Sequence, residues 1–220
     1  MTKFSIQEKI RIRVPDIHVG LMTGTVDNTE FNDSLWGKIS ATMDRLKPGL
    51  TMENIREIPP IKMGKSAYRL LGKDPNRYRI SAEALLRRIS KGMQLYQINS
   101  LVDILNMVSI STGITIGGFD ADKIIGDVSL GIGIENEEFE AIGRGELNIH
   151  RLPVYRDQRS AIGSPTSDCM RTMMVPETTN VMMIITGFYG DDGIQECLSQ
   201  LKVLMEKYIF GRNFDINIAN

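Results

Sequence analysis

Residues 99–113 read NSLVDILNMVSISTG, and the sequence pattern differs on the two sides of this stretch. The stretch itself predicts a helix from about Ser100 to Ser111, which Gly113 ends because glycine readily adopts the left-handed conformation found at helix ends. Helical patterns dominate before it, after an opening pair of strands, whereas strand patterns punctuated by Gly and Asp follow it. Helices and strands in blocks favour an α+β fold, with mixed or antiparallel sheets and packed helices, over a doubly wound sheet.

The half of the chain before residue 99 is expected to be mainly helical. The expected elements are strands at Ile10–Val14 and His18–Val26, a helix from Asn32 or Asp33 to Pro48-Gly49, and helical fragments from Thr51 to Leu71 that Pro59-Pro60 interrupts. Ser81 is expected to cap the next helix, and Glu83 lies in its first turn near the positive end of the helix dipole.

The half after residue 113 is expected to form strands and one final helix. The predicted strands are Asp127–Ile134, Phe139–Ile142, Leu152–Tyr155, Met170–Val175 and Val181–Gly187. The final helix begins after Asp191-Asp192-Gly193, because apolar residues from Ile194 to Tyr208 recur at the three-and-four spacing of one helix face.

The composition indicates one domain that spans residues 1–220. Apolar residues make up 42% of the chain, which is enough for a sizeable core. No apolar run approaches the ~18 residues that span a bilayer, and the first residues lack the apolar core of a secretory signal. Two cysteines provide neither a disulfide framework nor a four-ligand zinc set. We therefore expect a cytoplasmic protein with no metal ion, no cofactor and no membrane partner.

Lys and Arg are concentrated in one part of the chain, although the net charge is −1. Residues 62–91 contain nine basic and two acidic residues, whereas residues 92–180 contain six basic and twelve acidic residues. Such a cluster is typical of surfaces that contact phosphate backbones, and the alternative is a solvated helix face with a loop. The residues expected to contact a nucleic-acid backbone are Lys65, Arg69, Arg77, Arg79, Arg87, Arg88 and Lys91.

Three polar segments are candidates for a binding or catalytic site. In the first, Asp103 and Asn106 share a helix face because they are three residues apart. In the second, two glycines around an arginine predict a tight turn that presents Arg144 and Glu146. The third, residues 163–172, is a loop whose backbone N–H groups are suited to an anion or a carbonyl oxygen. Its polar side chains are Ser164, Thr166, Ser167, Asp168, Arg171 and Thr172.

Each of these segments also has a structural explanation. Asp103 could brace a neighbouring loop through hydrogen bonds. Residues 143–146 could form a surface turn, and Asp168 could form an ion pair with Arg171. Taken together, we interpret the three segments as the walls of one polar cleft. This interpretation requires the carboxylates of Asp103, Glu146 and Asp168 to line a shared cavity.

Several motifs resemble a known family. They are Leu101-Val102-Asp103-Ile104-Leu105-Asn106, then Gly113, Phe119-Asp120, Asp122-Lys123-Ile124, and Thr178-Thr179-Asn180-Val181-Met182-Met183. Their order and spacing resemble the editing and tRNA-binding domain of the phenylalanyl-tRNA synthetase beta subunit, in the modules called B-three and B-four. The resemblance covers about residues 78–190. Free-standing versions of that domain carry the Ser-Asp-x-x-Arg-Thr element that is seen here from Ser167 to Thr172.

The resemblance implies tRNA or an aminoacyl-tRNA as the partner. In the synthetase, the domain hydrolyses tyrosine wrongly esterified to tRNA, at a site shaped by a histidine and a glutamate. This sequence has Gly117 at the position of the histidine and Ser167-Asp168 near that of the glutamate. Both departures argue against editing of tyrosine in particular, and the absence of the other synthetase parts from this sequence argues against aminoacylation by this chain.

Residue roles follow from the same resemblance as hypotheses. Backbone N–H groups near Gly163–Ser167 hold the carbonyl oxygen, and Asp168 or Glu146 holds an ammonium group or orients a water. Arg144 or Arg171 contacts ribose or phosphate, and the basic cluster follows the acceptor stem. Binding without chemistry is slightly favoured. The alternatives are a free-standing hydrolase of mischarged aminoacyl-tRNA and a binder of amino-acid-like small molecules with no RNA role.

Overall fold

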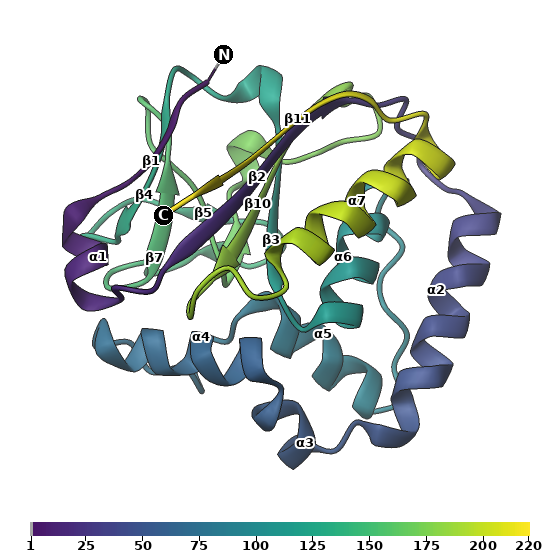
Figure 1. Cartoon of the computed structure of the whole chain (residues 1–220), viewed down its shortest axis with the longest axis horizontal. Helices are drawn as coiled ribbons and strands as arrows, with labels where there is room; N and C mark the ends of the chain where they lie inside the picture. The colour runs from purple at the N-terminus through teal and green to yellow at the C-terminus, as the bar shows by residue number, and fades with distance from the viewer. Residues whose placement is uncertain (1) are drawn as a thin grey trace.

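The protein, described over residues 2–220 by a computed structural model, contains two main β-sheets and a group of helices beside them (Figure 1). The four-stranded sheet has the order β11-β2-β10-β3, and all its neighbouring strands are antiparallel. Its strands are β2 (His18–Thr25), β3 (Thr115–Asp120), β10 (Asn180–Gly187) and β11 (Arg212–Ala219). The predicted α+β class is therefore confirmed.

The second sheet has five strands in the order β1-β4-β7-β8-β9. Only β1 and β4 pair in parallel, and the other neighbours are antiparallel. Its strands are β1 (Phe4–Ile6), β4 (Val128–Ile132), β7 (Pro153–Arg156), β8 (Ala161–Ser164) and β9 (Ser167–Asp168). A small hairpin of β5 (Glu140–Ala141) and β6 (Gly145–Glu146) lies outside both sheets.

Most of the helices gather on one side of the four-stranded sheet and below it in Figure 1, whereas α1 lies on the opposite side and packs against β4. In chain order they are α1 (Glu8–Arg13), α2 (Asp33–Leu46), α3 (Met52–Glu57), α4 (Pro59–Leu70), α5 (Ser81–Ser90), α6 (Ser100–Thr112) and α7 (Ile194–Ile209). Helices α6 and α7 pack against each other and against the four-stranded sheet, and α5 packs against α6 and α3. The helices α3, α4 and α5 thus form the lower edge of the molecule.

Helix α6 forms where residues 99–113 predict it. The Asn99 side chain accepts a hydrogen bond of 3.0 Å from the backbone N–H of Val102, and Gly113 ends the helix with a φ of 74°. A Cβ atom on Gly113 would lie 2.6 Å from Cγ2 of Ile58, so this position also needs glycine for lack of space. The helices that begin at Asp33, Met52, Pro59 and Ile194 agree with the sequence expectation as well.

The predicted strand at residues 10–14 is wrong, because this segment is mostly helix α1. Ile10 and Val14 are buried, whereas Ile12 between them is 70% exposed. Burial at a spacing of four residues is that of a helix, and the charged residues between these positions make the sequence look like an alternating strand.

The predicted strand at Met170–Val175 is also wrong. Residues Met170–Thr172 form a short 3-10 helix, and extended chain leads from it to β10. Among residues 2–220, no strand pairs with this segment in a ladder, although β5 lies beside it and Ala141 forms a single bridge with Cys169. The Arg171 side chain instead holds it by donating to the carbonyl oxygen of Lys123 and to Asp157.

The strands that were not predicted are β1, β3, β6, β8, β9 and β11. The sequence of β3, TIGGFD, contains two glycines, which weaken a strand because they pack no side chain. Every residue of β3 is buried, and its pairing with β10 over six residues determines its conformation. In the part of the chain that the structure describes, no helix is both long and apolar enough to cross a bilayer.

Candidate nucleic-acid interface

Asp103 braces the loop before α6 instead of facing a cavity. It is 1% exposed, and its carboxylate accepts hydrogen bonds from Nε1 of Trp36 at 2.7 Å and from the backbone N–H of Ile98 at 3.1 Å. Burial raises the pKa of Asp103, and these two hydrogen bonds act in the opposite direction. Asp103 therefore ties helix α2, the loop and α6 together.

Replacing Asp103 by alanine is expected to destabilise the protein by about 2 kcal/mol, since two buried donors lose their acceptor. Asp103→Asn keeps an acceptor oxygen at the same place and is expected to cost less. Urea unfolding followed by the fluorescence of Trp36 measures both free energies of unfolding. Equal stability of Asp103→Ala and the wild-type protein would contradict the bracing role.

Asp168 lies between the two sheets. Its Oδ2 accepts a hydrogen bond of 3.2 Å from the backbone N–H of Gly118, whereas its Oδ1 is sealed from solvent and has no partner among residues 2–220. Although other atoms of this residue remain partly exposed, burial of the carboxyl group raises its pKa to about 7, against the effect of the Gly118 hydrogen bond. The group is suited to being a protonated carboxylic acid rather than a carboxylate.

Two glycines make the room for the Asp168 side chain. A Cβ on Gly163 would lie 2.7 Å from Oδ1 of Asp168, and a Cβ on Gly117 would lie 3.3 Å from this oxygen and 3.0 Å from the ring of Phe119. The Phe119 ring is fully buried and packs edge-to-face on Tyr155. The space that a histidine at position 117 would need is thus filled by Phe119 and Asp168.

The structure does not bring Asp103, Glu146 and Asp168 together. Asp103 is enclosed beside α2, Glu146 is exposed on the β5–β6 hairpin, and Asp168 is held between the sheets. Neither of the two pockets described below includes any of them. The prediction that these three carboxylates line one cavity is therefore wrong. Local hydrogen bonds hold Asp103 and Asp168, and packing also encloses Asp168.

The Ser-Asp-x-x-Arg-Thr element is engaged in internal contacts. Arg171 pairs with Asp157 at 2.8 Å, not with Asp168. Although burial of Asp157 acts to raise its pKa, hydrogen bonds from Ser160, Ile125, Arg171 and Arg159 outweigh this effect and lower the pKa. Thr172 is fully buried, and its hydroxyl donates to the carbonyl oxygen of Ile162.

The turn at residues 164–167 closes on itself and docks onto the helices. The Ser164 hydroxyl accepts hydrogen bonds from the backbone N–H groups of Thr166 and Ser167 at 3.2 Å. The Thr166 hydroxyl lies 2.8 Å from the hydroxyl of Tyr68 in α4, and the carbonyl oxygen of Pro165 accepts from the backbone N–H of Ser81. Ser81 is not the expected helix cap, because its hydroxyl bonds to Thr115.

The motifs Phe119-Asp120 and Thr178-Thr179-Asn180 meet in the four-stranded sheet. The Thr178 hydroxyl donates to Oδ2 of Asp120 at 2.9 Å, and Lys123 pairs with the same oxygen at 3.0 Å. The Asn180 amide donates to both carboxylate oxygens of Asp122 at 3.1 Å. These motif residues hold β3, the turn after it and the start of β10 in register.

Three of the predicted site residues lie together in one pocket, where they meet side chains from α5. Asn106, Arg144 and Thr166 line a pocket of about 400 Å³, which we call the second pocket. Its other lining residues are Arg79, Ser81, Ala84, Leu85, Arg87, Arg88, Lys91, Met93 and Tyr96. The polar segments thus contribute to one hollow through their amide, guanidinium and hydroxyl groups, together with the basic cluster.

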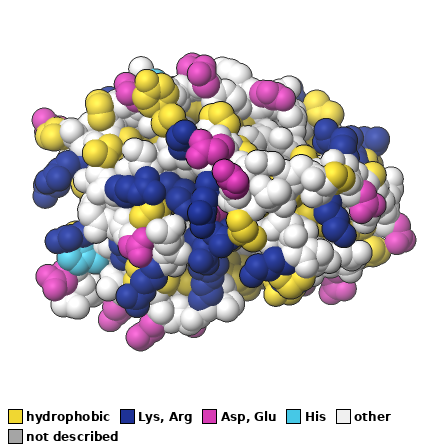
Figure 2. Space-filling view, turned by 90° about the horizontal axis from the view of Figure 1, so that it is seen from below, with side chains coloured by type: hydrophobic (Ala, Val, Ile, Leu, Met, Phe, Trp, Pro, Cys, Tyr) yellow, Lys and Arg dark blue, Asp and Glu magenta, His cyan; other side chains and the backbone are white. Residues whose placement is uncertain are grey.

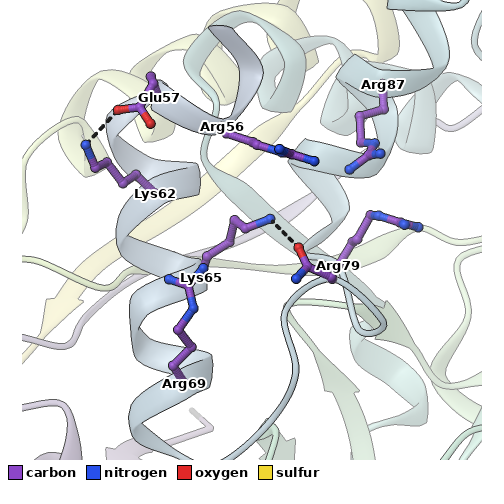
Figure 3. Close-up of a pocket in the computed structure, with 8 residues that line it drawn as sticks. Arg56, Glu57, Lys62, Lys65, Arg69, Arg79 and Arg87 are labelled. Atoms are coloured by element: carbon purple, nitrogen blue, oxygen red, sulfur yellow. Dashed lines mark hydrogen bonds and ion pairs between the residues drawn. The ribbon is translucent and has the colours of Figure 1, made fainter. Parts of the chain in front are cut away.

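The first pocket, of about 490 Å³, lies next to the second and is almost entirely basic. It is lined by Arg56, Glu57, Lys62, Lys65, Arg69, Asn76, Arg79 and Arg87. Figure 3 shows that Arg56 from α3 and Arg87 from α5 point toward each other across it. Glu57, its only acidic lining residue, is paired with Lys62 at 2.6 Å.

A buried carboxylate organises the wall between α4 and α5. Glu83 is fully buried and pairs with Nζ of Lys65 at 3.3 Å and with Nη1 of Arg87 at 3.0 Å. Lys65 also donates to Oδ1 of Asn76. Lys65 is only 5% exposed, so its role is to hold Glu83 and the pocket wall rather than to reach outward.

The two pockets share Arg79 and Arg87 and together form what we call the basic face. Its cations are Arg56, Lys62, Lys65, Arg69, Arg79, Arg87, Arg88, Lys91 and Arg144. Figure 2 views the molecule from below and shows Lys and Arg side chains gathered on this side. Six of the seven residues predicted to contact a nucleic-acid backbone lie here, and Arg77, which lies over the ring of Tyr78, is outside both pockets.

Lys73 is a cation of the sequence cluster that points inward. Its ammonium group donates to the carbonyl oxygens of Asn148 and His150 and lies 3.8 Å from the centre of the Tyr78 ring. Burial, followed by the nearby charges of Arg77 and Arg151, lowers its pKa to about 8. The sequence alone does not separate such an internal lysine from those of the basic face.

The fold and this surface define an α+β domain with a basic, pocketed face built on α3, α4 and α5. A family model described as "B3/4 domain" matches residues 64–200. The chain belongs to the B3/4 domain family, and the predicted resemblance is confirmed over a slightly longer range than residues 78–190.

Among solved structures, the chain is similar to an N-terminal fragment of the phenylalanyl-tRNA synthetase beta subunit from Pyrococcus horikoshii, with a TM-score of 0.49 and 12% sequence identity. The alignment covers 98% of this chain and 50% of that fragment, so this chain spans half the length of the fragment. A comparison with curated protein sequences gave no match.

Proposed function

We propose that this protein binds RNA through its basic face and that the RNA is a tRNA, bound without chemistry. The tRNA part of the proposal rests on the motifs that resemble the editing and tRNA-binding domain of the phenylalanyl-tRNA synthetase beta subunit. The RNA part rests on the charge and shape of the basic face.

The observation that carries this proposal is the pair of adjoining pockets with nine Lys or Arg side chains and one acidic side chain, Glu57, in their lining. The guanidinium groups of Arg56 and Arg87 point toward each other (Figure 3), and Arg87 is paired with Glu83, whereas no ion pair of Arg56 is seen among residues 2–220. Arginine binds phosphate oxygens through several N–H donors in a fixed plane. A phosphodiester chain carries one anion per nucleotide, so a single strand offers anions to two adjoining pockets.

The lining of the second pocket supports binding rather than hydrolysis. Among the described residues that line it there is no Asp, Glu, His or Cys to orient a water or to hold a substrate ammonium group. Asp168 is packed between Gly117, Gly163 and Phe119, and Glu146 lies on the exposed hairpin. Neither carboxyl group is a neighbour of a bound aminoacyl ester in this arrangement.

Removing two cations of the basic face is expected to weaken tRNA binding and its dependence on salt. The variant Arg56→Gln with Arg79→Gln removes one side chain of the first pocket and one that both pockets share. Each lost phosphate contact reduces the slope of log Kd against log salt by about 0.7–0.9. Fluorescence anisotropy with labelled tRNA over a salt series is expected to show a slope reduced by about 1.5.

The matched control is Lys9→Gln with Lys38→Gln, which removes two exposed cations from α1 and α2, outside both pockets. This control is expected to keep most of the wild-type slope. If tRNA does not bind at low salt, or if both double variants change the slope equally, the basic face is not the RNA site. A deacylation assay with a panel of mischarged tRNAs tests the claim that binding occurs without chemistry. Hydrolysis of any of these esters faster than without protein would show that the protein is a hydrolase.

A further inference from the structure

The segment between α5 and α6 presents apolar side chains beside the second pocket. Tyr96 is 64% exposed and Met93 is 43% exposed, and both line the pocket. Leu95 between them is buried and anchors the segment in the core. What distinguishes Tyr96 from other exposed aromatic residues such as Tyr189 is its place at the edge of a basic pocket, where a bound anion brings its own flat groups close to the ring.

The Tyr96 ring is held in place from one side. The guanidinium group of Arg88 lies 3.7 Å from the centre of the ring, and its Nε donates to the carbonyl oxygen of Gln94. The backbone N–H of Met93 donates to the carbonyl oxygen of Arg88 at 3.2 Å. Since Arg88 covers one side of a ring that is mostly exposed, the opposite side is free for a second planar group.

The second pocket combines two kinds of surface. Ala84, Leu85, Met93 and Tyr96 provide an apolar side, and Arg79, Arg87, Lys91 and Arg144 provide the cations. A ligand that fits both has a flat apolar part attached to an anionic part. A nucleotide whose base is not stacked in a helix has this chemistry, because its base face is available for stacking and its phosphate is negative.

We propose that Tyr96, backed by Arg88, is a stacking platform for an unpaired base of the RNA that the basic face binds. This inference rests on the proposed function and adds a preference for RNA with a single-stranded segment over fully paired RNA. In duplex RNA the bases are stacked on one another, so no base face reaches the Tyr96 ring. Arg79 and Arg87, which both pockets share, lie where the backbone of such a segment passes from one pocket to the other.

The test compares two RNA hairpins with the same stem and the same loop, one with a blunt end and one with an unpaired 3′ tail of about four nucleotides, so that the tail is the only difference between them. Wild-type protein is expected to bind the tailed hairpin about 10-fold more tightly than the blunt one, as one stacked base contributes on this scale. Tyr96→Ala is expected to lose this preference while it still binds the blunt hairpin. Tyr96→Phe keeps a ring and is expected to retain the preference.

Tyr189→Ala is the matched control, because Tyr189 is also 64% exposed and lines neither pocket of the basic face. The fluorescence of 2-aminopurine placed in the tail gives a readout that charge alone does not produce, since stacking on an aromatic ring quenches it. Quenching is expected with the wild-type protein and with Tyr189→Ala, and it is expected to be absent with Tyr96→Ala.

The outcomes separate this inference from the proposed function. If Tyr96→Ala keeps the tail preference and the quenching, the platform is refuted and RNA binding stands. If neither hairpin binds at low salt, the proposed function fails and this inference fails with it. If polyglutamate binds as tightly as the tailed hairpin and depends equally on Tyr96, the surface recognises an acidic polypeptide and the inference is overturned.

Discussion

Glu83→Gln is expected to destabilise the protein by about 3–5 kcal/mol, the cost typical of breaking a buried ion pair from one side. Glu83 is fully buried between Lys65 and Arg87, and Lys65 is nearly as buried. Without the negative charge, the Lys65 ammonium group keeps only neutral oxygen acceptors such as the amide oxygen of Asn76, and little of its side chain is exposed to water. Urea unfolding at neutral pH measures this loss as a lower free energy of unfolding.

Two further variants show whether the buried charge causes the effect. Glu57→Gln removes a carboxylate whose pair with Lys62 is exposed, with 63% and 57% of the respective side chains accessible, and it is expected to cost less than about 1 kcal/mol. Lys65→Met combined with Glu83→Leu removes both buried charges and fills a similar volume. This double variant is expected to recover most of the lost stability. If it is as unstable as Glu83→Gln, lost packing rather than the unpaired charge of Lys65 causes the destabilisation.

Asp168 is expected to make the protein less stable as the pH rises from about 4 to 7. Burial raises the pKa of its carboxyl group to about 7 in the folded protein, against 3.8 for the unperturbed group. Between these values the folded state holds a proton that the unfolded state has released, so rising pH favours unfolding. The loss is complete above the folded pKa and amounts to at most about 4 kcal/mol.

Asp168→Asn is expected to abolish this pH dependence, because the amide does not titrate. It keeps an oxygen for the backbone N–H of Gly118, while its NH₂ group faces the position where Oδ1 has no partner. The informative quantity is therefore the difference in unfolding free energy between about pH 5 and pH 8, rather than stability at one pH. The control Glu146→Gln changes an exposed carboxylate and is expected to keep the wild-type difference. If Asp168→Asn also keeps the wild-type difference, Asp168 is not the group that causes the pH dependence.

The basic face was visible in the sequence because seven of its nine cations lie in residues 62–91, a short segment that folds into parts of α4 and α5 and the turn between them. Arg56 and Tyr96 were not identified as site residues. Arg56 lies outside the charge cluster in sequence, and only the packing of α3 against α5 brings it opposite Arg87. For Tyr96, the available signal was an aromatic residue close after Arg87, Arg88 and Lys91, as is common in nucleic-acid binding surfaces.

The sequence singles out the polar segments, but it does not give the direction of each side chain. Asp103 and Asn106 share a helix face by spacing, yet Asp103 bonds to Trp36 and Asn106 lines the second pocket. Arg171 was expected near Asp168 and pairs with Asp157. Such choices depend on residues distant in the chain, and the local sequence contains no information on where those residues lie.

The sequence by itself determined most of the helices, with α1 as the exception, because the spacing of apolar residues and the residues at helix ends act within a few positions of each other. It also determined the family, because the motifs are read in order along the chain. The tertiary structure decided which polar groups are free to bind a ligand. A buried carboxyl group such as that of Glu83 or Asp168 has to be paired or protonated, and which of the two occurs depends on contacts made only after folding.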